Sequence, residues 1–94
     1  MPWARRTSGL QAGQTATIFG GGGVGLSIIQ GCRIAGALQI IALDQFDTKL
    51  EMAHLVGATH VVNTTQDDPG QAVRRLTGGA GVNHAFEAVG NAAL

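Results

Sequence analysis

The sequence predicts an α/β fold in which a parallel sheet carries helices on both faces. Short apolar runs alternate with helix-like segments along the chain, and the connections between them are short. This alternation indicates parallel strands joined by right-handed crossovers. The apolar runs are continuous rather than alternating with polar residues, which is typical of strands buried on both faces. About four strands are expected from this pattern.

The first half of the chain contributes two strands and one helix. A short, partly β-branched apolar run predicts a strand at Ala16–Phe19. A helix is expected over Val24–Ala35, where a single narrow polar stripe predicts burial of the helix on more than one side. Gly36 follows it as a C-cap glycine. The apolar run Leu38–Leu43 is the second expected strand, and Asp44 ends it.

A second helix and a third strand follow. Thr48 and Glu51 have the spacing of a capping box, so the second helix is expected to start near Thr48. Gly57 would end this helix. The run His60–Val62 is apolar and β-branched after its first residue, and it predicts the third strand.

The last predicted elements are a short helix and a fourth strand. Asp68 and Pro69 give an N-cap followed by proline at the first helical position, so a helix is expected to start there. The glycine-rich stretch Thr77–Gly81 predicts a loop, and Val82–Ala88 predicts the fourth strand.

Composition limits the classes of partner. The chain has 94 residues, which indicates a single domain, and its six basic residues balance six acidic ones. The sequence has no basic patch of the kind that indicates nucleic-acid binding. No apolar run approaches the roughly 18 residues of a membrane span. The single cysteine, Cys32, excludes an internal disulfide and an all-cysteine metal site. The cytosol is therefore the expected compartment.

A glycine motif lies between the first predicted strand and the first predicted helix. Gly20, Gly22 and Gly25 form G-x-G-x-x-G. In this position the first glycine permits a tight turn, the second lets the backbone approach a pyrophosphate, and the third lets the helix pack against the strand. The helix N-terminus offers free N–H groups to phosphates. The alternative reading of the motif alone is a flexible glycine turn.

Asp44 strengthens the dinucleotide reading. It ends the second predicted strand 19 residues after Gly25, and no other acidic residue occurs before it. A Rossmann-type dinucleotide site places an acid about 20 residues after the motif to bind the adenosine ribose hydroxyls. The alternative role for Asp44 is a strand-end turn. The carboxylate would repel the 2′-phosphate of NADP, and Gln45 and Phe46 follow it instead of an arginine, so NAD is favoured over NADP.

The chain resembles the coenzyme-binding domain of the zinc-dependent medium-chain alcohol dehydrogenases over about residues 10–94. Several segments carry the resemblance together: "GGGGVGLS", "IIALD", "KLEMA", "GATHVVN" and "FEAVG". Two positions depart from the family pattern. Gly21 stands where a larger residue is usual, and Asn83 stands where the family often has Asp.

The resemblance implies roles for particular residues. The pyrophosphate would be held by Gly20, Gly22, Gly23 and Gly25, and Val24 would approach the nicotinamide side. Asp44 and Lys49 would both bind the adenosine ribose, and Ala88 and Val89 would bound the adenine side. Read on its own, Lys49 is an exposed helix lysine.

The resemblance also implies what residues 1–94 lack. They would form a partial NAD-binding Rossmann domain with an incomplete sheet, a fragment without the family's catalytic zinc domain. Zinc is expected only in the complete enzyme, and so is the small alcohol or aldehyde substrate. A homo-oligomer is one assembly that the sequence leaves open. The chain alone is expected to be inactive.

None of the remaining reactive residues is assigned to catalysis. The three histidines, His54, His60 and His84, fall on different predicted elements, and their spacing indicates no shared ligand set. Cys32 is interpreted as a packed thiol and Glu87 as a structural acceptor. The leading hypothesis is the NAD-binding part of an alcohol dehydrogenase-like oxidoreductase. The alternatives are a stand-alone nucleotide-binding module without catalysis and a truncated gene product with no folded function.

Overall fold

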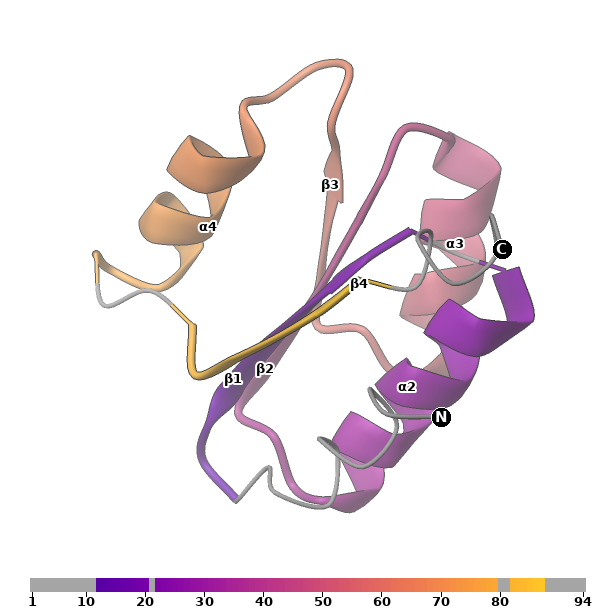
Figure 1. The fold of residues 1–94 in the computed structure, drawn as a ribbon, viewed down its shortest axis with the longest axis vertical. Helices are drawn as coiled ribbons and strands as arrows, with labels where there is room; N and C mark the ends of the chain where they lie inside the picture. The colour runs from indigo at the N-terminus through magenta and orange to yellow at the C-terminus, as the bar shows by residue number, and fades with distance from the viewer. Residues whose placement is uncertain (1–11, 21, 80–81, 88–94) are drawn as a thin grey trace.

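The computed structural model describes residues 12–20, 22–79 and 82–87. These residues form one four-stranded sheet in which all the strand pairs are parallel, and three helices (Figure 1). In chain order the elements are β1 (Thr15–Phe19), α2 (Gly22–Ile34), β2 (Gln39–Asp44), α3 (Asp47–Val56), β3 (His60–Asn63), α4 (Pro69–Leu76) and β4 (His84–Glu87). The strand order is β3-β2-β1-β4. The chain crosses from one side of β1 to the other between β3 and β4, as in Rossmann-type sheets.

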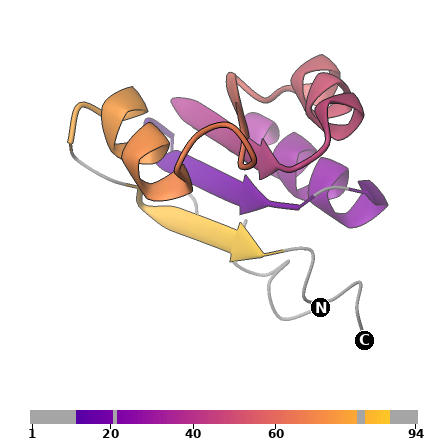
Figure 2. The same cartoon turned by 90° about the horizontal axis from the view of Figure 1, so that it is seen from above.

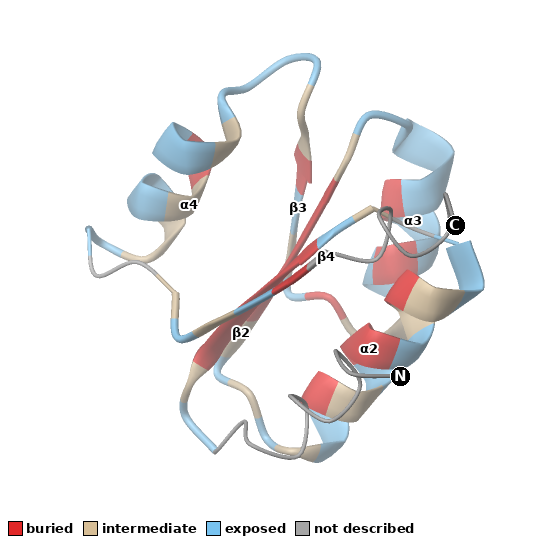
Figure 3. Ribbon diagram, in the orientation of Figure 1, coloured by how far each residue is buried: buried red, intermediate tan, exposed pale blue. Residues whose placement is uncertain are grey.

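Helices cover both faces of the sheet, as the sequence predicts. Figure 1 shows α2 and α3 on one face and α4 on the other, and Figure 2 shows β4 at one edge, next to β1. Strand β2 divides its side chains between the faces. Ile40 and Ala42 pack in the cluster under α2 and α3, while Ile41 and Leu43 pack with Ala72 of α4. The buried residues therefore concentrate in the central strands and on the helix sides that face them (Figure 3).

Helix α2 starts earlier than the sequence predicts and is less buried. It begins at Gly22 rather than Val24, so Gly22 and Gly23 lie in its first turn, where the N–H groups have no intrahelical partner. It is capped at Gly36, which has φ of 82°, and the Ala37 N–H donates to the Cys32 carbonyl. The prediction that this helix is buried on more than one side was wrong at its C-terminal end, since Ile34 is 87% exposed.

The predicted capping box of the second helix was also wrong. Helix α3 begins at Asp47, and its N-cap residue Phe46 makes no side-chain cap hydrogen bond. The first turn is instead held by the neighbouring strand, because Asn63 Nδ2 donates to Asp47 Oδ1 at 2.8 Å. Gly57 ends the helix as predicted, with its N–H donating to the His54 carbonyl.

The last two elements confirm one prediction and shift another. Asp68 caps α4 through Oδ2, which accepts from the Gln71 N–H at 2.9 Å. Strand β4 begins at His84 rather than Val82, because Asn83 exchanges two hydrogen bonds with Thr15, one through its backbone N–H and one through its side-chain oxygen. The predicted strand end at Ala88 lies outside the described residues. None of the helices in the described residues has the length and apolar character needed to span a membrane.

Candidate functional site

The glycine motif and Asp44 lie together at the carboxyl edge of the sheet. Strands β1 and β2 pair in register, with Phe19 opposite Leu43. Gly20 follows Phe19 just beyond β1, and Asp44 follows Leu43 as the last residue of β2. The Gly20 N–H donates to the Leu43 carbonyl at 2.8 Å. The tight turn after β1 therefore sits beside the end of β2, as the dinucleotide reading requires.

The glycines of this turn have the two properties that the motif predicts. Gly20 and Gly22 have positive φ, 87° and 71°. A Cβ atom at Gly22 or Gly23 would meet nothing within 4 Å, so the backbone is open to an approaching group. A Cβ atom at Gly25 would lie 2.8 Å from the Gly20 carbonyl oxygen, so this glycine is needed for close packing. Gly21 lies outside the described residues.

The start of α2 is suited to an anion. Its first N–H groups have no intrahelical partner, and the helix dipole adds partial positive charge there. The first turn contains no acidic residue that would oppose a phosphate. Val24, also in this turn, is partly buried and packs against the core under α2 and α3. Part of the Val24 side chain is therefore taken up by packing, and its backbone lies at the start of the helix.

Asp44 is oriented by the loop that follows it. Its Oδ1 accepts from the Phe46 N–H at 3.1 Å, and its carbonyl accepts from the Thr64 N–H at 3.0 Å. The turn role considered from the sequence is therefore real for one carboxylate oxygen. Among the described residues, Oδ2 makes no hydrogen bond to protein, so one oxygen is left to accept from a ligand. The two roles of Asp44 are compatible.

Lys49 and the glycine turn border the same hollow. A depression of about 280 Å³ between the first turns of α2 and α3 is lined by Gly22, Gly23, Leu26, Thr48, Lys49 and Met52. The structure thus brings the exposed Lys49 to the open glycines. Asp44 does not line this hollow. Ala88 and Val89 lie outside the described residues, and their expected role stays a prediction.

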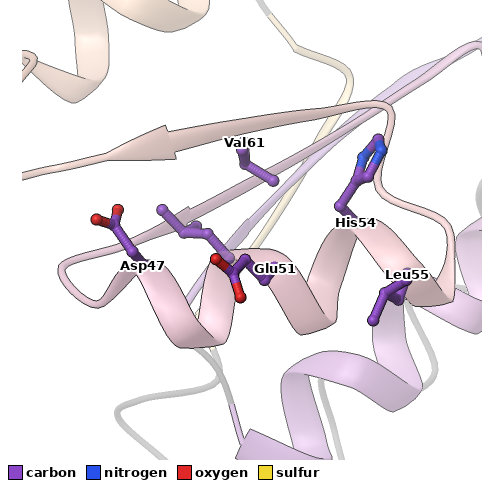
Figure 4. A pocket seen from close by; sticks show the side chains of 6 residues that line it. Asp47, Glu51, His54, Leu55 and Val61 are labelled. Atoms are coloured by element: carbon purple, nitrogen blue, oxygen red, sulfur yellow. The ribbon is translucent and has the colours of Figure 1, made fainter.

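A second hollow, of about 540 Å³, lies on the other side of α3, between that helix and β3 (Figure 4). Asp47, Glu51 and His54 project from α3 along it, and Val61 projects from β3. The sequence reading did not foresee this hollow. Its lining mixes two carboxylates with Leu50, Leu55 and Val61. Asp47, Glu51 and His54 are all exposed, so the polar groups of this hollow lack the burial of a built binding site.

The histidines have separate hydrogen-bond partners. His54 Nδ1 donates to the Ala58 carbonyl at 3.1 Å, and His84 Nε2 lies 3.0 Å from Gln14 Oε1. His60 Nδ1 lies 3.0 Å from the hydroxyl of the adjacent Thr59. Within residues 12–20, 22–79 and 82–87, no group of three or more His, Cys, Asp or Glu side chains could hold a metal ion. This part of the chain therefore offers no ligand set for a metal ion.

Cys32 is a packed thiol, as predicted. It is fully buried in α2 among the apolar residues of the core under α2 and α3. Burial raises the pKa of the thiol from 9.0 to about 11, because the thiolate is poorly solvated there. A thiol with a raised pKa is a poor nucleophile at neutral pH. The side chain of Glu87 lies outside the described part of the structure.

Sequence reasoning missed Asn63. It lies opposite Asp44 on the neighbouring strand and contacts Asp47 at the start of α3. The only available signal was its place after a β-branched run, at the carboxyl end of a predicted strand. That position identifies the edge of the sheet but not the partner, which lies 16 residues earlier in the chain.

The strand order, the tight glycine turn and the acid at the end of β2 define a Rossmann-type α/β fold. The model of the zinc-binding dehydrogenase family matches residues 23–94. The chain belongs to this family. The resemblance seen in the sequence is thereby confirmed.

Curated relatives agree with this assignment. The chain is 44% identical over 90 residues to an alcohol dehydrogenase class-3 of Myxine glutinosa, a match that covers 94% of the chain and 24% of that protein. It is 43% identical over 86 residues to an S-(hydroxymethyl)glutathione dehydrogenase of Synechocystis sp., covering 90% of the chain and 23% of that protein. The chain thus spans about a quarter of the length of the curated relatives it matches.

Solved structures show the same likeness in three dimensions. An alcohol dehydrogenase from a Thermus species matches 93% of the chain with a TM-score of 0.84 and 31% identity, over 25% of that protein's length. A benzyl alcohol dehydrogenase from Acinetobacter calcoaceticus matches 82% of the chain with a TM-score of 0.78 and 39% identity, over 21% of its length. The fold of this chain is therefore that of one part of a larger enzyme of this family.

Proposed function

We propose that this chain binds NAD(H) as the coenzyme-binding part of an alcohol dehydrogenase-like oxidoreductase. The observation that carries the proposal is the open backbone at Gly22 and Gly23, at the start of α2 and beside the end of β2. A ligand with a pyrophosphate and a ribose matches these two neighbouring features. We assign residues 1–94 to one partial NAD-binding domain. The residues that hold catalytic zinc would have to come from outside this chain.

The proposed roles combine the geometry of the carboxyl edge with the family resemblance, which supplies the roles of Val24 and Lys49. Gly20, Gly22, Gly23 and Gly25 shape the pyrophosphate cradle, and the backbone at Val24 continues it toward the nicotinamide side. Asp44 accepts from the adenosine ribose through the oxygen that Phe46 leaves free. Lys49 reaches toward the same ribose from the first turn of α3. Ala88 and Val89 are proposed to bound the adenine side, on the basis of the family resemblance.

The cofactor preference comes from charge. A carboxylate at the end of β2 repels an additional phosphate on the ribose. Gln45 and Phe46, which follow Asp44, supply no compensating cation, so NAD is preferred over NADP. Lys49 is a basic residue of this region, and it lines the same hollow as Gly22 and Gly23.

The bound coenzyme supplies hydride acceptance or donation at its nicotinamide ring. The residues of this chain contribute binding and orientation. The helix N-terminus neutralises phosphate charge, and the packed Gly25 holds that terminus against the turn. An alcohol or aldehyde would be the substrate of the complete enzyme, with zinc polarising its oxygen. We place the protein in the cytosol, because a chain with a single cysteine has no internal disulfide that would require an oxidising compartment.

Calorimetric titration with NADH tests the proposal, and Gly23→Val is the sharpest variant. Gly23 lies in the first turn of α2 without a positive φ, and the space outside it is open. A valine there fits the fold but fills the space proposed for the pyrophosphate. We expect the parent to bind NADH and Gly23→Val to bind at least about tenfold more weakly, with an unchanged circular dichroism spectrum. Equal binding by the two folded proteins contradicts the proposal.

A folded chain that binds NADH without any partner also supports the stand-alone module, which was the alternative from the sequence. The two readings differ in what must be added for turnover. For the oxidoreductase, alcohol oxidation requires a zinc-containing partner segment of this family. For the module, no such addition gives turnover.

A further inference from the structure

We infer that Asn63 is a positioning residue for coenzyme binding, acting through Asp47 on the segment that runs from Asp44 at the end of β2 to Lys49 in the first turn of α3. The inference rests on the proposed function of these last two residues. Asn63 touches no proposed ligand group. It connects the end of β3 to the start of α3 and so fixes the helix turn that presents Lys49.

The side chain of Asn63 is held on both sides. Its Nδ2 donates to Asp47 Oδ1 at 2.8 Å. Its Oδ1 accepts from the N–H of Thr65 at 2.9 Å and from the Thr65 hydroxyl at 2.6 Å. The carboxamide therefore cannot rotate without breaking three hydrogen bonds, and the donor to Asp47 stays aimed at the start of α3.

The backbone of the same turn adds a second attachment to β2. Asn63 lies opposite Asp44 in the parallel register, and the next residue, Thr64, donates its N–H to the Asp44 carbonyl. The Asn63 carbonyl in turn accepts from the N–H groups of Gln66 and Asp67. The turn after β3, here called the turn block, is thus held by several hydrogen bonds, and the β2–α3 loop is attached to it.

Only Gln45 and Phe46 separate Asp44 from the first residue of α3. Both ends of this short loop are fixed by the turn block, at the Asp44 carbonyl and at the Asp47 carboxylate. Inside the loop, the Phe46 N–H donates to Asp44 Oδ1 and the Phe46 carbonyl accepts from the Lys49 N–H. A shift of Asp47 would therefore be passed to the carboxylate of Asp44 and to the helix turn of Lys49.

The contact between Asn63 and Asp47 matters because helix α3 has no side-chain N-cap. Phe46 cannot cap the helix, and the sequence supplies no side chain that does so. The acidic Asp47 favours the helix N-terminus electrostatically, and Asn63 fixes where that acid lies. Figure 4 shows Asp47 at the end of the hollow between α3 and β3, separated from Glu51 and His54 further along the helix.

The test compares four single variants of the 94-residue chain and the double variant Asn63→Ala/Asp47→Ala. Asn63→Ala removes the donor, and Asp47→Ala removes the acceptor from an exposed position without touching the turn after β3. Asp47→Asn keeps an acceptor oxygen for Asn63 and changes only the charge. Gln39→Ala is the matched control, because the Gln39 carboxamide also joins two segments but at the opposite end of the sheet, through the Leu76 carbonyl at 2.8 Å and the Thr15 hydroxyl at 3.2 Å.

Two readouts are measured for each variant. The first is the dissociation constant for NADH and for ADP-ribose. We expect Asn63→Ala and Asp47→Ala to weaken both ligands by about three- to tenfold, the usual effect of one hydrogen bond, with no further loss in the double variant. Asp47→Asn should stay close to the parent, and Gln39→Ala should lower the melting temperature without changing either constant.

The second readout is amide hydrogen exchange at Phe46 and Lys49, which needs no ligand. Exchange there should be faster in Asn63→Ala and Asp47→Ala than in the parent, and unchanged in Gln39→Ala. If the parent does not bind NADH, the proposed function is contradicted. The positioning contact is then tested by amide hydrogen exchange alone. Unchanged exchange in Asp47→Ala overturns the inference. If the parent binds NADH, an unchanged NADH affinity in Asn63→Ala and Asp47→Ala overturns it as well.

Discussion

A Cβ atom on Gly25 would lie 2.8 Å from the carbonyl oxygen of Gly20, so the first turn of α2 packs directly against the tight turn after β1. Real Cβ atoms do not approach a backbone oxygen this closely. The contact explains why this helix, which covers the sheet, has a glycine at the buried position of Gly25. It also sets the distance of the open glycines Gly22 and Gly23 from the end of β2.

Replacing Gly25 should therefore be costly. We expect Gly25→Ala to lower the free energy of unfolding by about 1–3 kcal/mol, the usual range for overpacking, because the obstructing atom is backbone and cannot rotate away. Urea denaturation measures the change. Gly23→Ala is the matched control, since its position is helical and open, and it should be neutral or stabilising by up to about 1 kcal/mol. Equal effects of the two substitutions would contradict this packing argument.

The sequence was sufficient for the order and type of all the described strands and helices. Apolar runs locate β1 and β2, and the glycines Gly36 and Gly57 locate two helix ends, because these signals depend on neighbouring residues. The glycine turn and Asp44 were also placed correctly at one edge. Parallel topology forces the carboxyl ends of paired strands to the same edge, so their meeting follows from the element order.

Other features depend on contacts that local patterns do not encode. Thr48 and Glu51 have the spacing of a capping box, but α3 starts before Thr48 because Asn63, from β3, holds Asp47. The exposure of Ile34 was missed because a helical pattern identifies apolar faces without showing what covers each one. The adenine-side residues Ala88 and Val89 lie outside the described part of the chain, and their role is still a prediction.

The buried thiol gives a pH-dependent stability. The pKa of Cys32 is raised from 9.0 to about 11 in the folded state by burial, so unfolding releases a proton above pH 9. Its contribution to the free energy of unfolding is complete below about pH 9 and is lost as the pH rises toward about 11. We expect the parent to lose up to about 3 kcal/mol more than Cys32→Ala across this interval. An equal loss of unfolding free energy in the two proteins between about pH 9 and about pH 11, measured by denaturation, would refute the burial argument.

This chain is expected to show no alcohol dehydrogenase activity by itself, with or without added zinc. The described residues contain no set of side chains that could hold the metal, and zinc sites need three or four ligands. The assay follows NADH production from primary, secondary and aromatic alcohols. Steady production that a chelator abolishes would disprove the expectation.

Self-association is expected at high protein concentration. In the described residues β4 pairs with β1 on one side only, and an unpaired strand edge is a template for another chain. Ile34 and Leu55 add exposed apolar surface on α2 and α3, with 87% and 76% of each residue exposed. Sedimentation velocity over a concentration series should show a shift to larger species. A single monomer boundary at every concentration would be the opposite result.

The central claim is that Asp44 binds the adenosine ribose, and the ratio of NADH to NADPH affinity tests it most directly. Asp44→Gly should weaken NADH binding by about 2 kcal/mol, because the ribose loses its contact with the free oxygen of a partly buried carboxylate. Adding Gln45→Arg supplies a cation for the 2′-phosphate. Titration of both cofactors should show that the parent prefers NADH and that the double variant prefers NADPH. An unchanged ratio in a double variant that is still folded would show that Asp44 serves only the turn to Phe46, and would contradict the account.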